Sequence, residues 1–349
     1  MIKIVETLFY LNPSILVCIH FASLVMLIAI LLIHFAFSIF CLIRLRQGLR
    51  HVEWSDEQRR SATPNKAWIP FLRPSPAFLP SRLRMYFRAV FSAPLQLLAI
   101  FALHIIVALR IYFSGDAASA LRIPTRLLLE WIMRIKVTVV GEREECACIV
   151  ANHVSSFDIY ALLLTTAHSS IGPGLKPVCP GFLAKIETLK MPIIGRVALI
   201  LGSVFVDREN QGKREAVVSS VEKKLRTWKR EDAQLAIFPE GTTTNQGYLL
   251  PFKSSTLEFP GVKYQPLHIQ YSQPHNSLTF SSTLTHLIFS LCLDSSNLKM
   301  TWLPSIPGGP GAAEKMRLAI ANHGNFCLTN DGSFRAHREL TKLADRDFT

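Results

Sequence analysis

A histidine and an aspartate five positions apart are the first candidates for acid–base chemistry in this chain of 349 residues. His153 and Asp158 lie in the segment Asn-His-Val-Ser-Ser-Phe-Asp at 152–158. On a continuous helix, with about 100° per residue, their side chains would point about 140° apart. They can meet only if His153 lies in a loop and Asp158 is the third residue of a helix capped by Ser155. The carboxylate would then orient the imidazole and raise its basicity, leaving the second ring nitrogen to accept a proton.

The same segment also has an ordinary structural interpretation. Ser155 and Asp158 fit an N-terminal capping box, and His153 could be a solvated loop residue. On this segment alone, the catalytic and the capping interpretations are evenly matched.

A second polar segment, Gly-Ser-Val-Phe-Val-Asp-Arg at 202–208, ends a predicted strand on a cation. Arg208 at the end of a strand is suited to binding a phosphate group. Taken alone, however, the segment is better explained by a surface arginine that pairs with Asp207.

A third segment, Phe-Pro-Glu-Gly-Thr at 238–242, also follows a predicted strand. Gly241 permits close approach of the backbone, and Glu240 can accept hydrogen bonds from substrate hydroxyls or hold a cation. Alone, the segment would serve as a turn. Three polar clusters at the ends of three strands favour one shared site at a sheet edge over three independent turns.

Short apolar runs alternate with helical patterns over the central part of the chain. Runs of this length predict strands, and the apolar stripe of 216–228 predicts an amphipathic helix. This alternation indicates an α/β layer fold. The predicted strands are 135–140, 146–151, 203–206, 234–238 and 262–269.

The N-terminal region predicts a membrane anchor. No charged residue occurs from Thr7 to Ile43, and the apolar run that begins at Ile15 exceeds the length needed to cross a hydrocarbon core of about 30 Å. A cleavable signal peptide has a shorter apolar stretch, of about 7–15 residues, after a basic start. Because Glu6 offsets Lys3 here, we expect residues 1–43 to be an uncleaved transmembrane anchor.

A second uncharged run, within residues 89–112, predicts another membrane-embedded segment. The stretch 89–109 is long enough to cross, but Pro94, Gln96 and His104 make a re-entrant or monotopic hairpin equally compatible with it. We expect it to dip into the membrane and return, since that keeps the predicted site on the cytosolic side.

The segment between these runs carries more than half of the net charge. Residues 44–88 hold ten Lys and Arg against three Asp and Glu, a net of +7 out of +13 for the whole chain. Two tryptophans and five prolines interrupt it, so we expect a basic juxtamembrane loop on anionic headgroups. The remaining chain has no clustered basic stripe, which disfavours nucleic acid as the partner.

The segments, in this order, resemble the glycerolipid (lysophospholipid) acyltransferase family. The family's four blocks correspond to Asn-His-x-Ser-x-x-Asp at 152–158, Gly-x-x-Phe-x-x-Arg at 202–208, Phe-Pro-Glu-Gly-Thr at 238–242 and Val-x-x-x-Pro at 262–266. The resemblance covers residues 130–305 and implies an α/β fold with a mixed sheet flanked by helices. An N-terminal membrane helix or two-helix hairpin would precede this fold.

The resemblance also implies roles for individual residues. His153 would be the general base that activates a glycerol hydroxyl, with Asp158 as its orienting partner, and the acyl donor would be acyl-CoA. No cofactor and no metal are implied. The residues implied in substrate binding are Lys185, Gly202, Phe205, Arg208, Glu240, Gly241, Thr242 and Pro266.

The acceptor is the least determined part of this interpretation. The third block continues with Thr243, where many lysophosphatidate acyltransferases have arginine, so the sequence looks more like the lysophosphatidylcholine and lysophosphatidylethanolamine branch. Lysophosphatidic acid and glycerol 3-phosphate remain alternatives, as does a non-catalytic membrane-anchored lipid-binding protein. A serine hydrolase is disfavoured because no Gly-x-Ser-x-Gly segment occurs.

Taken together, the sequence predicts an integral membrane acyltransferase whose site faces the cytosol. The membrane would be the endoplasmic reticulum in a eukaryote or the inner membrane in a bacterium, and the partners would be membrane phospholipids, acyl-CoA and a lysophospholipid. The expected organisation is an anchor (1–43), a basic loop (44–88), a second membrane segment (89–112), a catalytic domain (113–305) and a helical tail (306–349).

Overall fold

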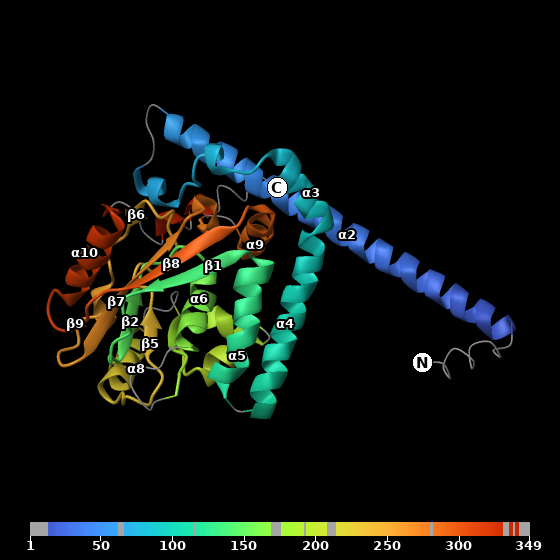
Figure 1. Ribbon diagram of the computed structural model, residues 1–349. Coiled ribbons are helices and arrows are strands. Elements are labelled where there is room, and N and C mark those ends of the chain that lie inside the picture. The colour runs from blue at the N-terminus through green and yellow to red at the C-terminus, as the bar shows by residue number, and fades with distance from the viewer. Residues whose placement is uncertain are drawn as a thin grey trace.

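The computed structural model describes most of the chain as a globular α/β body with a long N-terminal helix (Figure 1). The described residues are 13–61, 66–114, 116–168, 176–191, 193–207, 214–279, 282–330, 335–337 and 339–341.

Helix α2 (Pro13–Arg60) is one continuous helix of 48 residues, about 72 Å long at about 1.5 Å per residue. Its N-terminal half projects away from the body (Figure 1) and exposes apolar side chains such as Leu32 and Phe35, each 63% accessible. From Cys41 onward, one face of α2 is buried against the body. An apolar helical surface of this length is unfavourable in water, and it fits a membrane-bound chain.

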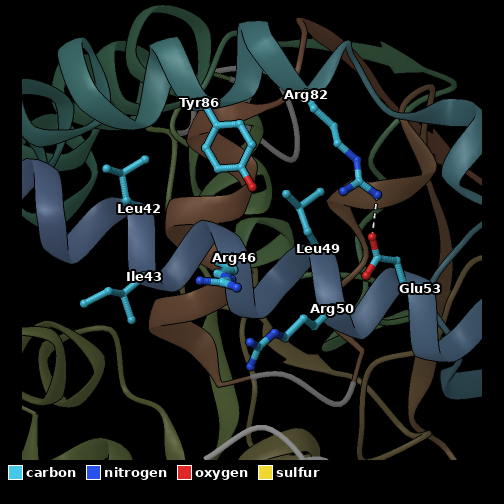
Figure 2. A pocket seen from close by; sticks show the side chains of 8 residues that line it. All are labelled: Leu42, Ile43, Arg46, Leu49, Arg50, Glu53, Arg82 and Tyr86. Atoms are coloured by element: carbon cyan, nitrogen blue, oxygen red, sulfur yellow. Dashed lines mark hydrogen bonds and ion pairs between the residues drawn. The ribbon is translucent and has the colours of Figure 1, made fainter.

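The predicted loop over 44–88 is wrong, because most of this segment is helical. Helix α2 continues to Arg60, a 3₁₀ helix spans Lys66–Phe71, and α3 (Arg82–Phe91) lies beside α2. An ion pair between Glu53 and Arg82 joins the two helices (Figure 2). The charge density and the prolines of 44–88 favour a loop locally. Contacts between α2 and α3, such as this ion pair, nevertheless accompany a helical structure in this segment.

Helix α4 (Ala93–Ser114) is also continuous, so the chain does not turn back between these residues. The helical course breaks only near the start of the predicted segment, at Ser92 between α3 and α4. One face of α4 packs on the body through Val107 and Ile111, while the opposite face exposes residues such as Leu109, which is 52% accessible. By length and composition, Phe21–Arg60 and Ala93–Phe113 are the two described helices that could cross a membrane.

The body is built on an eight-stranded mixed sheet, which confirms the predicted α/β fold. The strand order is β1-β8-β7-β2-β5-β3-β4, with β9 pairing to β7; β7 is antiparallel to β8 and β9, and all other pairs are parallel. A separate two-stranded sheet joins β6 and β10. The strands are β1 (Ile135–Val140), β2 (Cys148–Ala151), β3 (Gly181–Lys185), β4 (Val204–Val206), β5 (Leu235–Ile237), β6 (Tyr248–Leu249), β7 (Lys263–Tyr271), β8 (Ser296–Trp302), β9 (Ile306–Pro307) and β10 (Cys327–Leu328).

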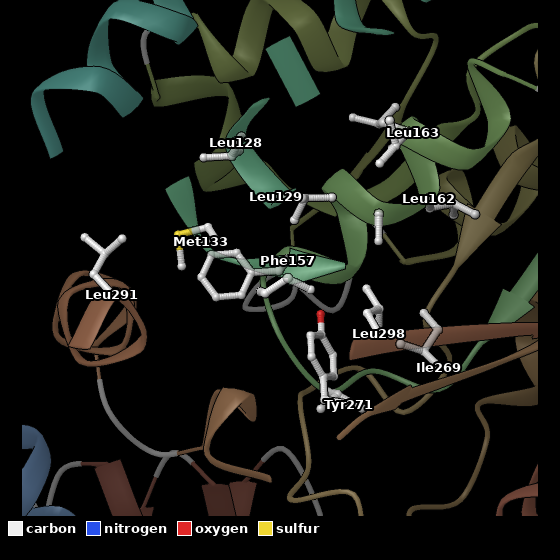
Figure 3. Close-up of a cluster of buried hydrophobic side chains, with 14 of the residues drawn as sticks. Leu128, Leu129, Met133, Phe157, Leu162, Leu163, Ile269, Tyr271, Leu291 and Leu298 are labelled. Atoms are coloured by element: carbon white, nitrogen blue, oxygen red, sulfur yellow. The ribbon is translucent and has the colours of Figure 1, made fainter. Parts of the chain in front are cut away.

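Helices cover both faces of the sheet. Successive residues of β2 point to opposite faces, so Ile149 joins one apolar cluster and Val150 joins the other. The first cluster, shown in part in Figure 3, includes α2 and α4, and the second includes α8 and α10. Because both faces are covered, the adjacent strands β2 and β5 are apolar throughout rather than alternating. The remaining helices are α5 (Ala117–Arg126), α6 (Phe157–Thr166), α7 (Ile194–Ile200), α8 (Arg214–Arg226), α9 (Thr283–Cys292) and α10 (Ala312–Gly324).

Most predicted elements of the body have counterparts in the structure. Strand β1 has the predicted bounds, and the other predicted strands and the helix at 216–228 differ by at most two residues at either end.

The segment 306–349 contains the predicted helix, but this helix is part of the body. Met316 and Ile320 of α10 are fully buried in the second apolar cluster, and Arg317 donates to the carbonyl oxygens of Leu249 and Thr329. The chain then adds β10 beside β6. Residues 306–328 therefore pack on the body rather than extending from it as a tail.

Candidate active site

The sheet topology brings two of the three predicted polar segments, 152–158 and 238–242, to one edge, together with Lys185. Strands β2, β5 and β3 are adjacent and parallel, so their carboxyl ends meet at the same edge. His153 follows β2, Glu240 follows β5, and Lys185 ends β3. With adjacent strands about 4.8 Å apart, Lys185 lies roughly 10 Å across the sheet from the β2 end. The prediction of a shared edge is confirmed for the segments 152–158 and 238–242. In the third segment, Asp207 follows β4, which is parallel to β3, so it lies at the same edge.

His153 and Asp158 form a hydrogen-bonded pair at this edge. The imidazole Nδ1 lies 2.9 Å from Oδ2 of Asp158, whose side chain is fully buried, while the His153 side chain remains 19% accessible. No described residue forms a hydrogen bond with Nε2 of His153. The ring also stacks on Phe238 from the end of β5, with ring centroids 4.2 Å apart. The imidazole is therefore held on one side by a carboxylate and on one face by a ring, with its second nitrogen left available.

Asp158 makes both sets of contacts that its position in the sequence suggested. Its Oδ2 accepts from the backbone N–H groups of Val154 (2.7 Å) and Ser155 (3.0 Å) as well as from His153. The capping contacts and the pairing with His153 are thus compatible, because one oxygen makes both. The helix starts one residue later than predicted, at Phe157, so Asp158 is the second helical residue and not the third.

Tyr271, which the sequence did not single out, completes the surroundings of Asp158. Its hydroxyl, at the end of β7, donates to Oδ1 of Asp158 at 2.7 Å. Burial raises the pKa of Tyr271 well above its ordinary value, so the hydroxyl stays protonated and remains a donor. Asp158 therefore accepts four hydrogen bonds, which suits an ionised carboxylate. The tyrosine lies 113 positions along the chain from Asp158, and no local pattern indicates such a contact.

Glu240 is a buried link between two loops. Its Oε1 accepts from the backbone N–H of His153 (2.9 Å), and its Oε2 accepts from the backbone N–H of Leu250 (3.1 Å). Burial raises the pKa of the Glu240 carboxyl to about 8, and the two backbone donors lower it in part. In the described structure, both oxygens thus bind backbone rather than facing outward as expected for a group that binds substrate hydroxyls.

The turn after Glu240 brings a further cation to the site. Gly241 has a φ of +75°, which favours glycine, and a Cβ built at Gly241 would lie 2.6 Å from Nζ of Lys253. Lys253 is exposed and was not among the predicted site residues. Thr242, a predicted binding residue, follows Gly241 in the same turn and is buried (8% accessible).

The remaining predicted binding residues are not brought to this edge. Gly202 lies at the amino end of β4, the opposite edge of the sheet, and Phe205 lies within that strand. Pro266 is buried within β7 opposite Val150. Arg208 lies outside the described residues.

Pro266 has a structural explanation in its position. Its carbonyl oxygen accepts from Leu303, so its nitrogen faces the same side of the strand. On that side β9 pairs with β7 up to Tyr264, and β8 pairs from Leu267 onward. A proline is tolerated here because its missing N–H falls in the gap between the two partner strands.

The N-terminal region also reaches the site, which the sequence did not indicate. The Asn245 side chain donates to the carbonyl oxygens of Ile69 and Leu72. In addition, Nε2 of His286 in α9 lies 3.2 Å from Oγ of Ser155, next to the His153–Asp158 pair. Burial, with a contribution from the nearby Arg73 guanidinium, lowers the pKa of His286 well below its ordinary value, so this imidazole is neutral.

Comparison with known proteins agrees with the resemblance in the sequence. Residues 134–268 match the family model described as Acyltransferase. A lysophospholipid acyltransferase of Arabidopsis thaliana is 30% identical over 205 residues, which cover 55% of this chain and 48% of that protein. Lysophosphatidylcholine acyltransferase 2 of Danio rerio is 30% identical over 194 residues, covering 52% of this chain and 33% of that protein.

This chain therefore spans about half the length of the first relative and a third of the second. Among solved structures, the 1-acyl-sn-glycerophosphate acyltransferase PlsC from Thermotoga maritima is similar with a TM-score of 0.44 and 17% identity, over 70% of this chain and 97% of that one. The family match begins one residue before β1 and ends within β7, so it includes His153, Asp158 and Glu240. Over residues 134–268, the chain is thus similar to the acyltransferase family.

Proposed function

We propose that the protein is an acyl-CoA-dependent O-acyltransferase that acylates a glycerol hydroxyl of a lysophospholipid. The observation that carries this proposal is the His153–Asp158 pair, 2.9 Å apart at the carboxyl edge of a parallel sheet. A hydroxyl is a poor nucleophile near neutral pH, and a positioned general base accelerates its reaction typically about 10²–10⁴-fold.

The reaction follows from the free nitrogen of His153. Nε2 accepts the proton of the acceptor's hydroxyl group while the hydroxyl oxygen attacks the thioester carbonyl carbon of acyl-CoA, forming a C–O bond. The tetrahedral intermediate then collapses, the C–S bond breaks, and the leaving thiolate receives the proton from His153. Both substrates are bound together, and no acyl-enzyme forms. Asp158 keeps the proton of neutral His153 on Nδ1 and stabilises the imidazolium that forms during the reaction.

A lysophospholipid is the favoured acceptor for two reasons. The relatives that match this chain are a lysophospholipid acyltransferase and a lysophosphatidylcholine acyltransferase by name. The third block also has Thr243 where an additional cation would suit a doubly charged phosphate. Anionic groups of either substrate would meet cations at the sheet edge: Lys185, Lys253 and, by the family resemblance, Arg208.

The experiment is transfer of a labelled acyl group from acyl-CoA in purified membranes that contain the wild type or His153→Ala. The acceptor panel contains lysophosphatidylcholine, lysophosphatidylethanolamine, lysophosphatidic acid and glycerol 3-phosphate. We expect transfer by the wild type to a lysophospholipid and a loss of at least about 10²-fold in the variant. His168→Ala, which removes an exposed histidine elsewhere, is the matched control and should retain transfer.

Retained transfer by a folded His153→Ala protein would overturn the assignment of the base. Absence of transfer by the wild type to every acceptor would favour the non-catalytic lipid-binding protein instead. Preference for lysophosphatidic acid or glycerol 3-phosphate would keep the reaction and replace the acceptor.

A further inference from the structure

A pocket of about 650 Å³ lies between α2 and α3, apart from the site at the sheet edge (Figure 2). It combines apolar side chains on one side with three arginines on the other. Its lining residues are Leu42, Ile43, Arg46, Leu49, Arg50, Glu53, Arg82 and Tyr86.

The pocket opens on the side of α2 that faces away from α9. Gly48 marks the side that packs on α9, because a Cβ there would lie 2.4 Å from the ring of Phe289. Arg46 and Arg50 are two positions before and after Gly48, so they point roughly 160° away from it, in opposite senses around the helix. An occupant of this pocket would therefore be separated by α2 from α9, which contacts the loop of His153.

The charges of the pocket are incompletely balanced. Glu53 forms an ion pair with Arg82, and Figure 2 shows this pair at one end of the pocket. Elsewhere in the basic segment, Arg84 and Arg88 pair with Asp294. Arg46 and Arg50, both exposed, pair with no described carboxylate. Two adjacent guanidinium groups on one helix face are suited to an anion such as a phosphate, which they can bind bidentately.

The other side of the pocket is apolar and continues into the projecting part of α2. Leu42 and Ile43 line the pocket, and Ile39 and Phe35, one and two turns earlier, are 43% and 63% accessible. A free phosphate or a nucleotide would leave this apolar surface uncovered. An amphiphile with an anionic head and a hydrocarbon chain would cover both parts.

We propose that the α2–α3 pocket binds one anionic phospholipid of the surrounding bilayer. Its phosphate lies between Arg46 and Arg50, the Tyr86 hydroxyl can donate a further hydrogen bond to it, and an acyl chain lies along Leu42, Ile43 and the preceding turns of α2. The arginines are at the point where the uncharged stretch of α2 ends at Ile43, which is where a headgroup would be. This proposal requires a membrane-bound α2 and does not depend on acyl transfer.

The test measures lipid binding rather than activity. The full chain, purified in a neutral detergent, is titrated with dioleoyl-phosphatidylglycerol or with dioleoyl-phosphatidylcholine, and bound lipid is counted by native mass spectrometry. We expect one phosphatidylglycerol to bind more tightly than phosphatidylcholine. The double variant Arg46→Gln, Arg50→Gln should lose about tenfold or more of this preference, since each basic residue at a membrane surface contributes several-fold to the affinity for anionic lipid.

A charge-matched control, Lys229→Gln with Lys315→Gln, removes two exposed cations outside the pocket and should keep the preference. Equal loss in both double variants would overturn the proposal in favour of non-specific charge attraction. Competition by inorganic phosphate at the same concentration would also overturn it, because the site would then bind phosphate without a lipid. Because Arg46 and Arg50 are exposed, the double variant should unfold in lipid-free detergent at the same temperature as the wild type, which separates lost binding from lost folding.

Discussion

At the scale of single residues, one carboxylate oxygen organises the candidate site. Oδ2 of Asp158 accepts from the His153 imidazole and from the backbone of the loop that carries His153. The position of the imidazole is therefore coupled to the conformation of the loop. A group that hydrogen-bonds to Asp158 therefore also affects the position of His153. Tyr271, which donates to Oδ1 of Asp158, is such a group.

Tyr271→Phe should impair the reaction without removing a group that touches substrate. The change leaves Oδ1 of buried Asp158 without its hydroxyl donor, and hydrogen bonds to charged groups contribute about 1.5–3 kcal/mol. We expect kcat to fall about 10–100-fold with little change in the KM for acyl-CoA.

Tyr264→Phe is the matched control for this change. Tyr264 is also a buried tyrosine of β7, but its hydroxyl donates to the carbonyl oxygen of Thr256, away from the site. An equal loss of kcat in both variants would show that Tyr271 acts only through folding.

Glu240 should make stability depend on pH. Burial raises its pKa from an ordinary 4.5 to about 8, so between these values the folded protein holds a proton that the unfolded chain releases. The free energy of unfolding contributed by Glu240 therefore falls as pH rises through this window. Glu240→Gln cannot titrate, so we expect the wild type to lose more stability than the variant between pH 5 and pH 8.

The measurement is the unfolding temperature of both proteins across this pH range. All other titrating groups are common to the two proteins, so the difference between their curves isolates Glu240. Parallel curves would mean that the carboxyl does not change its charge on unfolding in this window.

At the scale of elements, α2 and α9 connect the membrane region to the site. Gly48 lets α2 approach α9 closely, and His286 of α9 contacts Ser155 beside the His153–Asp158 pair. The position of α2 is thus transmitted to the loop of His153 through one intervening helix.

Gly48→Ala should destabilise this packing. Alanine in a helix gains about 1 kcal/mol over glycine by propensity, but its Cβ would lie 2.4 Å from the buried ring of Phe289. Overpacking of this kind costs about 1–3 kcal/mol, and the fully buried ring also has Arg73 over it at 4.8 Å, so it has little room to move. We therefore expect a lower unfolding temperature and reduced acyl transfer.

Gly247→Ala serves as the comparison, because its Cβ would make an ordinary contact of 3.5 Å. We expect an effect within about 0.5 kcal/mol there. An unchanged unfolding temperature in Gly48→Ala would show that α2 and α9 can separate without cost.

The sequence predicted those strands and helices that have a clear apolar periodicity, and it predicted that polar residues after the strands lie at one edge of the sheet. The strand at 135–140 and the helix near 216–228 follow from apolar periodicity, and parallel strands bring His153 and Glu240 to one edge. Tyr271 and His286 could not be predicted because long-range strand and helix packing brings them to Asp158 and Ser155. The segment 44–88 has the composition of a loop, and its helices are stabilised by partners far along the chain, such as Asp294.

At the scale of the whole molecule, the packing of α4 on the body limits how the chain can be arranged in a membrane. One face of α4 packs along the body and the other exposes apolar side chains (Figure 1). A full crossing by α4 would carry the attached polar body into the hydrocarbon, which is very unfavourable. We therefore propose that α4 lies in the membrane interface with its exposed face toward lipid, and that the chain before α3 and the body after α4 are on the same side.

Cysteine labelling would test this topology in sealed membranes with the cytosolic face outward. Single cysteines at Leu83 in α3 and Arg122 in α5, both exposed, mark the two flanks of α4. The background is Cys327→Ser, which removes an exposed native cysteine. A membrane-impermeant maleimide should label both positions without detergent. Labelling of one flank only after detergent is added would show that α4 crosses.

Because α2 is one continuous helix, it also fixes how far the globular body lies from the bilayer. Ile43 ends the uncharged stretch, and Gly48 touches α9 about 7.5 Å further along the helix, so the body begins within about one and a half turns of the hydrocarbon. Lifting a lipid chain of about sixteen carbons fully into water costs about 13 kcal/mol, at about 0.8 kcal/mol per methylene. In the proposed reaction, a body held this close would let a lipid present its headgroup to the site while its chain stays in the bilayer, so this extraction cost would not enter the reaction barrier.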